Sequence, residues 1–303
     1  MAGGQERVLR RRIRSVQSTR KITKAMELIA ASQILRAQNP MAANRPYRQG
    51  MARIVVEAAR ADPQAAAKLL GTPEDPRRLA VLAVVGDRGL SGPYNSSVLR
   101  ATERLLAGFV RAGRQAQLFT VGKKAQSYFR FRRQEVSRSF VGISERPSFA
   151  DARAVADALT APFLAGQVDQ VLMVTTHYLS AGSQAVETRQ LLPLPHPGRE
   201  GQDGAGPEGE VRAGYTEFEP DVETLLSELT AMAVESEIFT ALLEGAASFF
   251  TAQQRAMAAA TENADELIRT LSRIMNRARQ DAITTEIMEI VGGAEALRQS
   301  KGA

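Results

Sequence analysis

The chain has 303 residues, of which 44% are hydrophobic and 24% charged, and it contains no cysteine. This hydrophobic fraction is enough for one large core or two small ones, and the missing cysteine excludes disulfides and cysteine-ligated zinc. A net charge of +6 with only 5% aromatic residues favours an acidic partner and tightly packed helices over a surface that stacks on bases.

The first 61 residues predict one long helix. Apolar residues recur there at helical spacing, as at Val8, Ile13, Val16, Ile22, Met26 and Ile29. Pro40 and Pro46 each remove a backbone donor and crowd the preceding turn, so we expect a kink or a short break between Asn39 and Pro46. Residues 62–76 contain several prolines and a glycine and are expected to form a linker.

The middle of the chain, residues 77–195, follows a different pattern. Short apolar runs alternate with amphipathic segments, and in chain order these are 79–85, 95–111, 117–121, 149–164 and 170–176. Such alternation predicts the buried strands and covering helices of an α/β domain. Residues 187–195 are expected to form a last strand at an edge of the sheet, where prolines are tolerated.

The last part of the chain predicts a second, longer helix. Residues 196–214 are rich in Gly, Pro, Glu and Asp, which is typical of a flexible surface loop. Between Val222 and Val291 there is no proline and only one glycine, Gly245. A solitary helix of this length would expose its apolar stripe to water, so it requires a partner.

The N-terminal and C-terminal segments leave the same α/β domain, so they are expected to pair in antiparallel directions. If Arg60 lies level with Asp221, Met26 lies near Arg255, and the paired rod is on the order of 85 Å long. Beyond Arg277, roughly 20 residues should then project as a single helix. Its apolar face implies an apolar socket in another protein, and it comprises Ile283, Ile287, Ile290 and Val291.

The expected fold class is therefore a mixture of α+β and α/β. It combines a long antiparallel two-helix coiled coil, from residues 1–61 and 215–303, with a central Rossmann-like α/β domain at residues 77–195. Residues 196–214 form the flexible loop in this division.

Three segments resemble the γ subunit of F-type ATP synthases. They are SVQSTRKITKAMELIAAS near the start, DRGLSGPYN after the first strand and NRARQDAITTEIMEIVGGAEAL near the end. The resemblance covers essentially the whole chain. It implies a non-catalytic central rotor stalk, without cofactor or metal, that couples the proton-driven rotation of the c-ring to ATP synthesis by a hexamer of α and β subunits.

The resemblance also implies where partners are contacted. Residues that match family positions touching loops of the catalytic β subunits are Arg279, Gln280, Thr284 and Glu286. Those at the level of the acidic loops of the β subunits are Lys21, Lys24 and Met26. Glu219 resembles, less specifically, the foot segment near the c-ring, beside which the family carries its ε subunit.

Departures from the family pattern occur at Ser91 and Pro93, where the family usually has cysteine and glycine, and near Arg255, where the usual arginine is displaced. The absence of cysteine and of a leader favours a bacterial member over a chloroplast or mitochondrial one. The expected location is peripheral, on the cytoplasmic face of the cell membrane, with membrane contact only through the c-ring.

Two other function classes remain open from the residues alone. The basic composition also fits a nucleic-acid-binding coiled coil, although aromatic residues do not interleave with the basic ones. An α/β enzyme with a helical arm is the other class, and it would use Asp87 at the end of the first strand. His177 and His196 lack metal-ligand spacing and are expected to be structural or exposed.

Overall fold

The computed structural model describes residues 2–62, 66, 70, 75–195 and 222–301. They belong to two compact units. We call the unit made from Met1–Ile29 and Gln254–Ala303 the coil unit, and the unit made from Ala30–Gln253 the sheet unit. The expected loop at 196–214 and Glu219 lie outside the described residues.

Two long helices, α1 (Ala2–Ala61) and α6 (Val222–Lys301), run through both units and confirm the prediction of long terminal helices. Helix α1 continues without a break through Pro40 and Pro46, so of the two expected alternatives, a kink or a short break, the break is wrong. A proline inside a helix costs about 3 kcal/mol. Tertiary contacts of this part of α1 offset the cost. Asn44 donates to Thr240 Oγ1 of α6 at 2.8 Å, and Ala37 and Met41 pack in a cluster of buried apolar residues within the sheet unit.

The sheet has five strands in the order β3-β2-β1-β4-β5. Their bounds are Arg78–Val84 (β1), Gln115–Val121 (β2), Arg138–Phe140 (β3), Gln170–Tyr178 (β4) and Gln184–Leu192 (β5). The first four are parallel, and β5 pairs antiparallel with β4 along one edge. The predicted strands are confirmed, but the short strand β3 was not anticipated.

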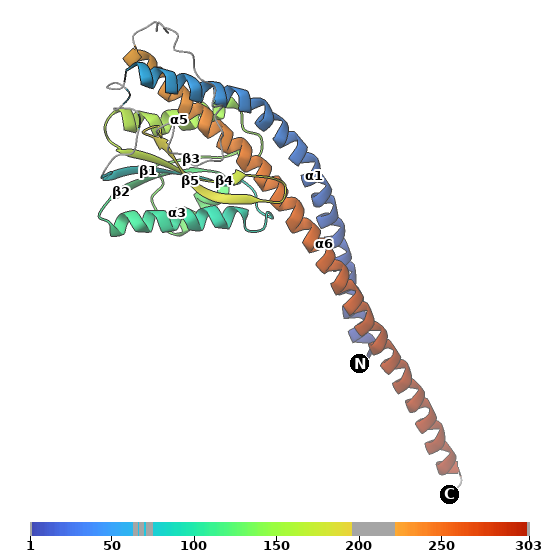
Figure 1. The fold of residues 1–303 in the computed structure, drawn as a ribbon. Helices are drawn as coiled ribbons and strands as arrows, with labels where there is room; N and C mark the ends of the chain where they lie inside the picture. The colour runs from blue at the N-terminus through green and yellow to red at the C-terminus, as the bar shows by residue number, and fades with distance from the viewer. Residues whose placement is uncertain (1, 63–65, 67–69, 71–74, 196–221, 302–303) are drawn as a thin grey trace. The chain divides into compact units, whose positions relative to one another are not determined.

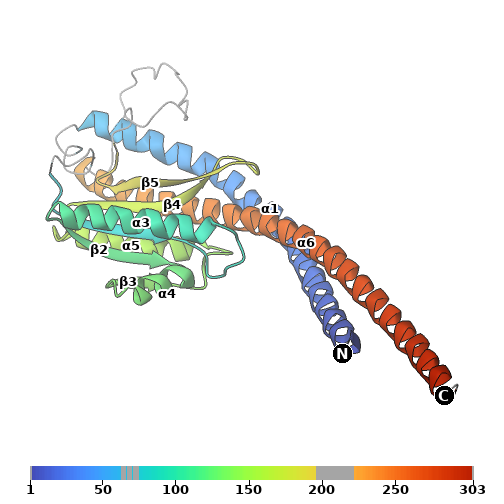
Figure 2. The same ribbon diagram turned by 90° about the horizontal axis from the view of Figure 1, so that it is seen from below.

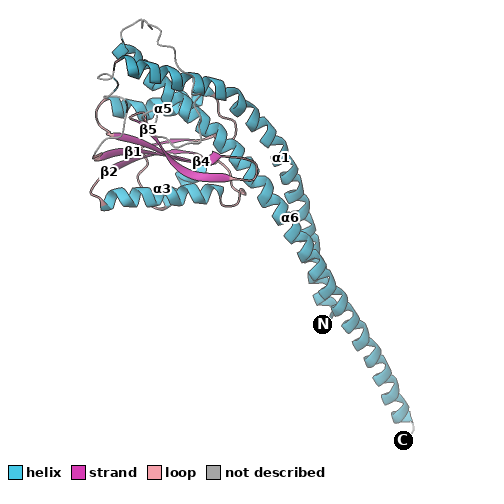
Figure 3. Ribbon diagram, viewed as in Figure 1, coloured by secondary structure: helices cyan, strands magenta, loops and turns pink. Residues whose placement is uncertain are grey.

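Helices cover both faces of this sheet (Figures 1 and 3). Helices α3 (Tyr94–Arg111) and α4 (Lys123–Phe131) pack on one face, and α5 (Phe149–Leu164) and the first half of α6 pack on the other. Helix α5 begins at a capping box, in which Ser148 and Asp151 satisfy each other's backbone N–H groups. The first half of α6 therefore belongs to the core of the α/β domain. The expected fold class did not include this packing of α6 on the sheet.

A separate cluster of buried residues lies where α1 ends and α6 begins. Ala66 and Leu70 pack there beside Val55 and Leu226, and Leu70 forms a β-bridge with Leu194. The stretch 62–76 was expected to be a simple linker. Its buried residues instead anchor the chain to both helices.

Candidate functional site

In the coil unit, α1 and α6 pack side by side along a narrow apolar seam. Its most buried side chains are Leu9, Ile13, Met257 and Ala264. The helices run in opposite directions, because Arg20 pairs with Asp265 at 2.7 Å while Thr23 contacts Thr261 at 2.8 Å between hydroxyl oxygens. The antiparallel pairing predicted from the sequence is confirmed.

The register differs from the expected one by about one helical turn. The contact between Thr23 and Thr261 places Met26 level with about Ala258, three residues beyond Arg255. The sequence-based estimate assumed that Arg60 and Asp221 are level. The polar pairs that cross the seam account for the observed register. A polar group inside a coiled coil favours the alignment in which it finds a hydrogen-bonding partner.

The unpaired part of α6 consequently begins later than Arg277. Near the start of α1, Gln5 borders a shallow hollow on α6 whose other residues are Ile274, Arg277, Ala278, Asp281, Ala282 and Thr285. Because Thr23 lies level with Thr261, Ala2 at the start of α1 lies level with about Ala282 of α6. From Ile283 to Lys301 the helix extends past the first residue of α1, as Figure 2 shows for the coil unit.

We call residues 283–301 the tip. Its apolar side chains are exposed, from 45% at Ile283 to 71% at Ile290, and the others are Ile287, Met288 and Val291. Exposed apolar residues arranged on one helical face mark a surface that other proteins cover. Sequence reasoning did not single out a second exposed apolar set on α1, which contains Ile22, Leu28 and Ile29.

The residues expected to contact partners are accessible wherever the structure describes them. Lys21 and Lys24 are exposed on α1, and Met26 is half-buried. Lys24 is partly neutralised by Glu27, whose carboxylate lies 2.9 Å from its Nζ. On α6, the exposed members of the set are Arg279, Gln280, Thr284 and Glu286.

Asp87, the candidate for enzyme chemistry, has a structural role at the carboxyl end of β1. Its carboxylate accepts hydrogen bonds from the backbone N–H groups of Lys123 and Gly142, at 3.0 and 2.9 Å, and from the hydroxyl of Ser144 at 2.7 Å. Burial alone would raise the pKa of Asp87, but these hydrogen bonds outweigh it and hold the pKa below its usual value. The carboxylate therefore joins the end of β1 to α4 and to the segment after β3.

The turn beside Asp87 requires a glycine. Gly122 has a φ of +94°, and a Cβ atom there would lie 2.3 Å from the carbonyl oxygen of Val85. This close approach brings the start of α4 against β1. Gly122 thus permits a tight connection between β2 and α4.

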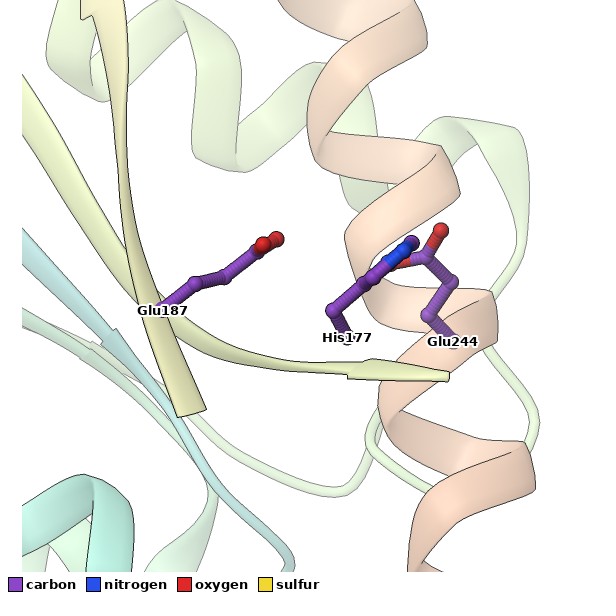
Figure 4. Close-up of side chains that lie close together, drawn as sticks. All are labelled: His177, Glu187 and Glu244. Atoms are coloured by element: carbon purple, nitrogen blue, oxygen red, sulfur yellow. The ribbon is translucent and has the colours of Figure 1, made fainter. Parts of the chain in front are cut away.

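A possible metal-binding set occurs on the other face of the sheet (Figure 4). His177, Glu187 and Glu244 each offer one ligand atom, and these atoms lie within 4.8 Å of one another. However, the guanidinium of Arg189 bonds to Glu187 and lies 2.8 Å from both Glu244 Oε2 and His177 Nδ1. This cation already occupies the carboxylate oxygens and the imidazole nitrogen that would bind a metal ion, and its charge would repel one. The set therefore does not fit a divalent metal.

Sequence reasoning missed this cluster around Arg189, although a signal for it was present. Glu187 and Arg189 alternate along the predicted edge strand, so they share one of its faces. Glu237 and Glu244 are seven residues apart on α6 and also share a face. Nothing in the sequence indicates that these two faces meet.

The family described as ATP synthase matches residues 5–297. The ATP synthase gamma chain of Frankia casuarinae is 47% identical to this chain over 298 residues, which cover 97% of this chain and 98% of the relative. The chain belongs to the ATP synthase gamma chain family. The gamma chain of Parafrankia sp. is similar at 46% identity over the same shares, and that of Streptomyces coelicolor is 43% identical over 299 residues, 97% of each chain.

Solved structures share this fold at lower sequence identity. A chain in the Euglena gracilis mitochondrial ATP synthase, in an assembly of OSCP, F1 and c-ring, aligns with a TM-score of 0.66 at 17% identity and covers 99% of this chain and 97% of that chain. A chain in the central stalk and c-ring structure from Tetrahymena thermophila aligns with a TM-score of 0.60 at 23% identity, covering 79% and 99%. These likenesses confirm the fold class. Among the described residues, no helix has the length and hydropathy to cross a membrane.

Proposed function

We propose that this chain is the central rotor stalk of a bacterial F-type ATP synthase and couples rotation of a proton-driven c-ring to ATP synthesis by surrounding subunits. Residues 1–61 and 215–303 are the shaft, residues 77–195 are the foot domain, and residues 196–214 are a loop of the foot. The stalk itself performs no catalysis in this proposal. It binds no cofactor.

The observation that carries the proposal is the exposed apolar tip of α6. Ile287 and Ile290 are 55% and 71% exposed in the isolated chain, beyond the point where α1 stops covering α6. A ring of subunits that encloses the tip would remove this surface from water. Apolar contacts are also non-directional, which suits a surface that must turn against its surroundings.

Residues near the tip and on α1, several of them charged, supply the proposed contacts with the catalytic subunits. In this proposal, loops of the β subunits contact Arg279, Gln280, Thr284 and Glu286. Lys21, Lys24 and Met26 are placed at their acidic loops, where opposite charge would steer the interface and weaken with salt. Glu219 is assigned to the c-ring side, where the ε subunit also binds.

Membrane contact in this proposal passes only through the c-ring, at the cytoplasmic face of the cell membrane. The basic composition is assigned to these protein contacts and not to nucleic acid. Part of the positive charge on α1 is already offset within the coil unit, as Arg20 pairs with Asp265 and Arg10 with Glu6.

The test is co-purification from the organism's own cells with an affinity tag on the chain. Recovery of a complex of catalytic subunits that hydrolyses ATP supports the proposal. A matched chain that lacks residues 283–303 should recover less of this complex. Recovery of the full chain alone, or bound to nucleic acid at 150 mM salt, would refute the proposal.

A further inference from the structure

The cluster around Arg189 joins strand β5 to helix α6 inside the sheet unit. The guanidinium bonds to Glu187 on its own strand, and it donates to Glu237 Oε1 and Glu244 Oε2 of α6, each at 2.8 Å. His177 on β4 closes the cluster, with Nδ1 at 2.8 Å from Nη2 of the same guanidinium. Three carboxylates thus share one cation across the edge of the sheet.

The centre of this cluster is removed from water, while the side chains of Glu187, Glu237 and His177 around it are between 24% and 32% exposed. The side chain of Arg189 is 14% exposed and that of Glu244 is 6% exposed. Burial alone would lower the pKa of Arg189, but the three neighbouring carboxylates outweigh it and raise the pKa, so the guanidinium stays charged. Charge-assisted hydrogen bonds in such surroundings are stronger and less sensitive to salt than exposed ion pairs.

The geometry of the contacts restrains α6 in two directions. Glu237 and Glu244 lie two turns apart along the helix, about 10 Å, and one guanidinium holds both. If α6 slid along the sheet or turned about its axis, at least one of the two bonds would have to break. Because the planar guanidinium has a fixed fork of donors, it cannot follow such a movement as a flexible ammonium group would.

Helix α1 is tied to the same point. Glu237 uses Oε1 for Arg189, and its Oε2 lies 3.2 Å from Nε of Arg48 on α1. One carboxylate of α6 therefore connects the edge strand on one side with the other helix of the shaft on the other side.

Other contacts also join the α/β domain to α6. Apolar side chains around Val234, Ile238 and Leu242 form a core whose contacts are non-directional. Edge-to-face aromatic contacts add to this core, and one of them joins Phe149 of α5 to Phe239 of α6.

Arg153 on α5 also pairs with Glu235 of α6, at 3.3 Å. The side chain of Glu235 is 12% exposed, but that of Arg153 is 60% exposed, and this exposure weakens the pair. The pair also holds a single position of the helix, whereas Arg189 holds two.

We infer that Arg189 is the joint that transmits torque between the α/β domain and α6. It is a positioning residue that holds Glu237 and Glu244 of the rotor helix against strand β5, so that the helix cannot slip on the sheet under load. This inference rests on the proposed rotor function, since torque has meaning only for a chain that turns.

The experiment compares Arg189→Lys with Arg153→Lys in the complete ATP synthase. Both changes keep the positive charge and lose the guanidinium fork, and both affect a partner on α6, but only the first lies in the buried cluster. The measurements are ATP hydrolysis and ATP-driven proton pumping into vesicles, with and without an opposing proton gradient. Pumping against a gradient loads the rotor, whereas hydrolysis in uncoupled vesicles does not.

The expected result is unchanged hydrolysis in uncoupled vesicles for both variants. In Arg189→Lys, uncoupled turnovers against the gradient should become about tenfold more frequent, which corresponds to a loss of ~1.4 kcal/mol in holding the helix. Arg153→Lys should pump like the wild type. Equal pumping by Arg189→Lys and the wild type at every gradient would overturn the inference.

A second variant keeps the test decisive if Arg189→Lys does not assemble. The triple change Arg189→Leu, Glu237→Gln and Glu244→Gln removes the cation together with its two partners on α6, and it leaves the carboxylate of Glu187, whose side chain is 32% exposed. Joint neutral replacement of buried ion partners is often tolerated. It should fold and slip under load, and wild-type pumping by this variant would also overturn the inference. If the wild-type chain itself fails to restore ATP synthesis to complexes that lack their gamma chain, the proposed function fails instead.

Discussion

The coil unit and the sheet unit use the same two helices in opposite ways. In the sheet unit, α6 lies in a core, and Leu242 is only 1% exposed. In the coil unit, α6 has a single narrow seam, and apolar residues such as Ile274 and Ile287 remain 45% and 55% exposed. One continuous helix thus changes from a structural element to a binding surface, because the number of elements packed around it changes along its length.

The largest expected effect comes from removing the tip, residues 283–303. The truncated chain should stay folded, with its helical content reduced only by the missing residues, because these residues lie beyond the seam with α1. Coupling of proton flow to ATP synthesis in the assembled enzyme should be largely lost. Circular dichroism and ATP synthesis by vesicles check the two parts, and loss of most of the helicity would contradict the description of the tip as unpaired.

A pair of core and surface substitutions gives the next largest effect. Leu242→Ala should destabilise the chain by about 2–5 kcal/mol, since it leaves a cavity in a packed core. Ile287→Ala, at an exposed position of the tip, should change the free energy of unfolding by less than about 0.5 kcal/mol. Urea denaturation of the isolated chain measures both, and similar losses for the two variants would mean that the tip is packed in the free chain.

A smaller effect is expected at Asp87, where Asp87→Asn should cost about 1–2 kcal/mol near neutral pH through weakened hydrogen bonds. The folded state lowers the pKa of Asp87, so its contribution is fully present above the unfolded value of about 3.9. It is lost as the pH falls from there through the folded pKa.

The stability difference between wild type and Asp87→Asn should accordingly be constant from neutral pH to about pH 5 and shrink below about pH 4. Denaturation at several pH values measures it. Asp157→Asn, at an exposed position of α5, is the control and should show little difference throughout. A difference for Asp87→Asn that grows in acid would contradict the assigned hydrogen bonds.

The smallest effect belongs to the ion pair that crosses the seam of the coil unit. Arg20 and Asp265 have side chains 42% and 41% exposed, so Arg20→Ala should cost only about 0.2–1 kcal/mol. Salt should reduce the difference further. Thermal melting at low and high salt measures it against Arg12→Ala on the exposed face of α1, and a loss above about 2 kcal/mol would show that the seam depends on this pair.

Local sequence patterns predicted the helices and strands that have a strong apolar periodicity or clear boundaries. The apolar run at Leu79–Val85 became β1, and the proline-free stretch after Val222 became α6. The three-residue strand β3 escaped prediction because so short a segment has no periodicity. The continuity of α1 through Pro40 also escaped it, since packing against α6 decides that point and propensity does not.

The candidate site was also predictable from the sequence only in part. The tip was predictable because an apolar stripe on an unpaired helix is visible in the residue order. Its beginning near Ile283 and not Arg277 depends on the register, which differs from the expected one by about one turn, and on the start of α1 at Ala2. Neither is visible in the pattern of either helix. The cluster around Arg189 was not predictable, because its members come from β4, β5 and α6.

By itself, then, the sequence determined that two long helices pair antiparallel around a central α/β domain and that one of them ends in an exposed apolar stripe. These are consequences of periodicity, helix length and chain direction, which are all local or topological. Only the tertiary structure decided the register of the helix pair, the structural role of Asp87 and the grip of Arg189 on α6. Each of these depends on distances between residues far apart in the chain, and such distances arise only when the elements pack.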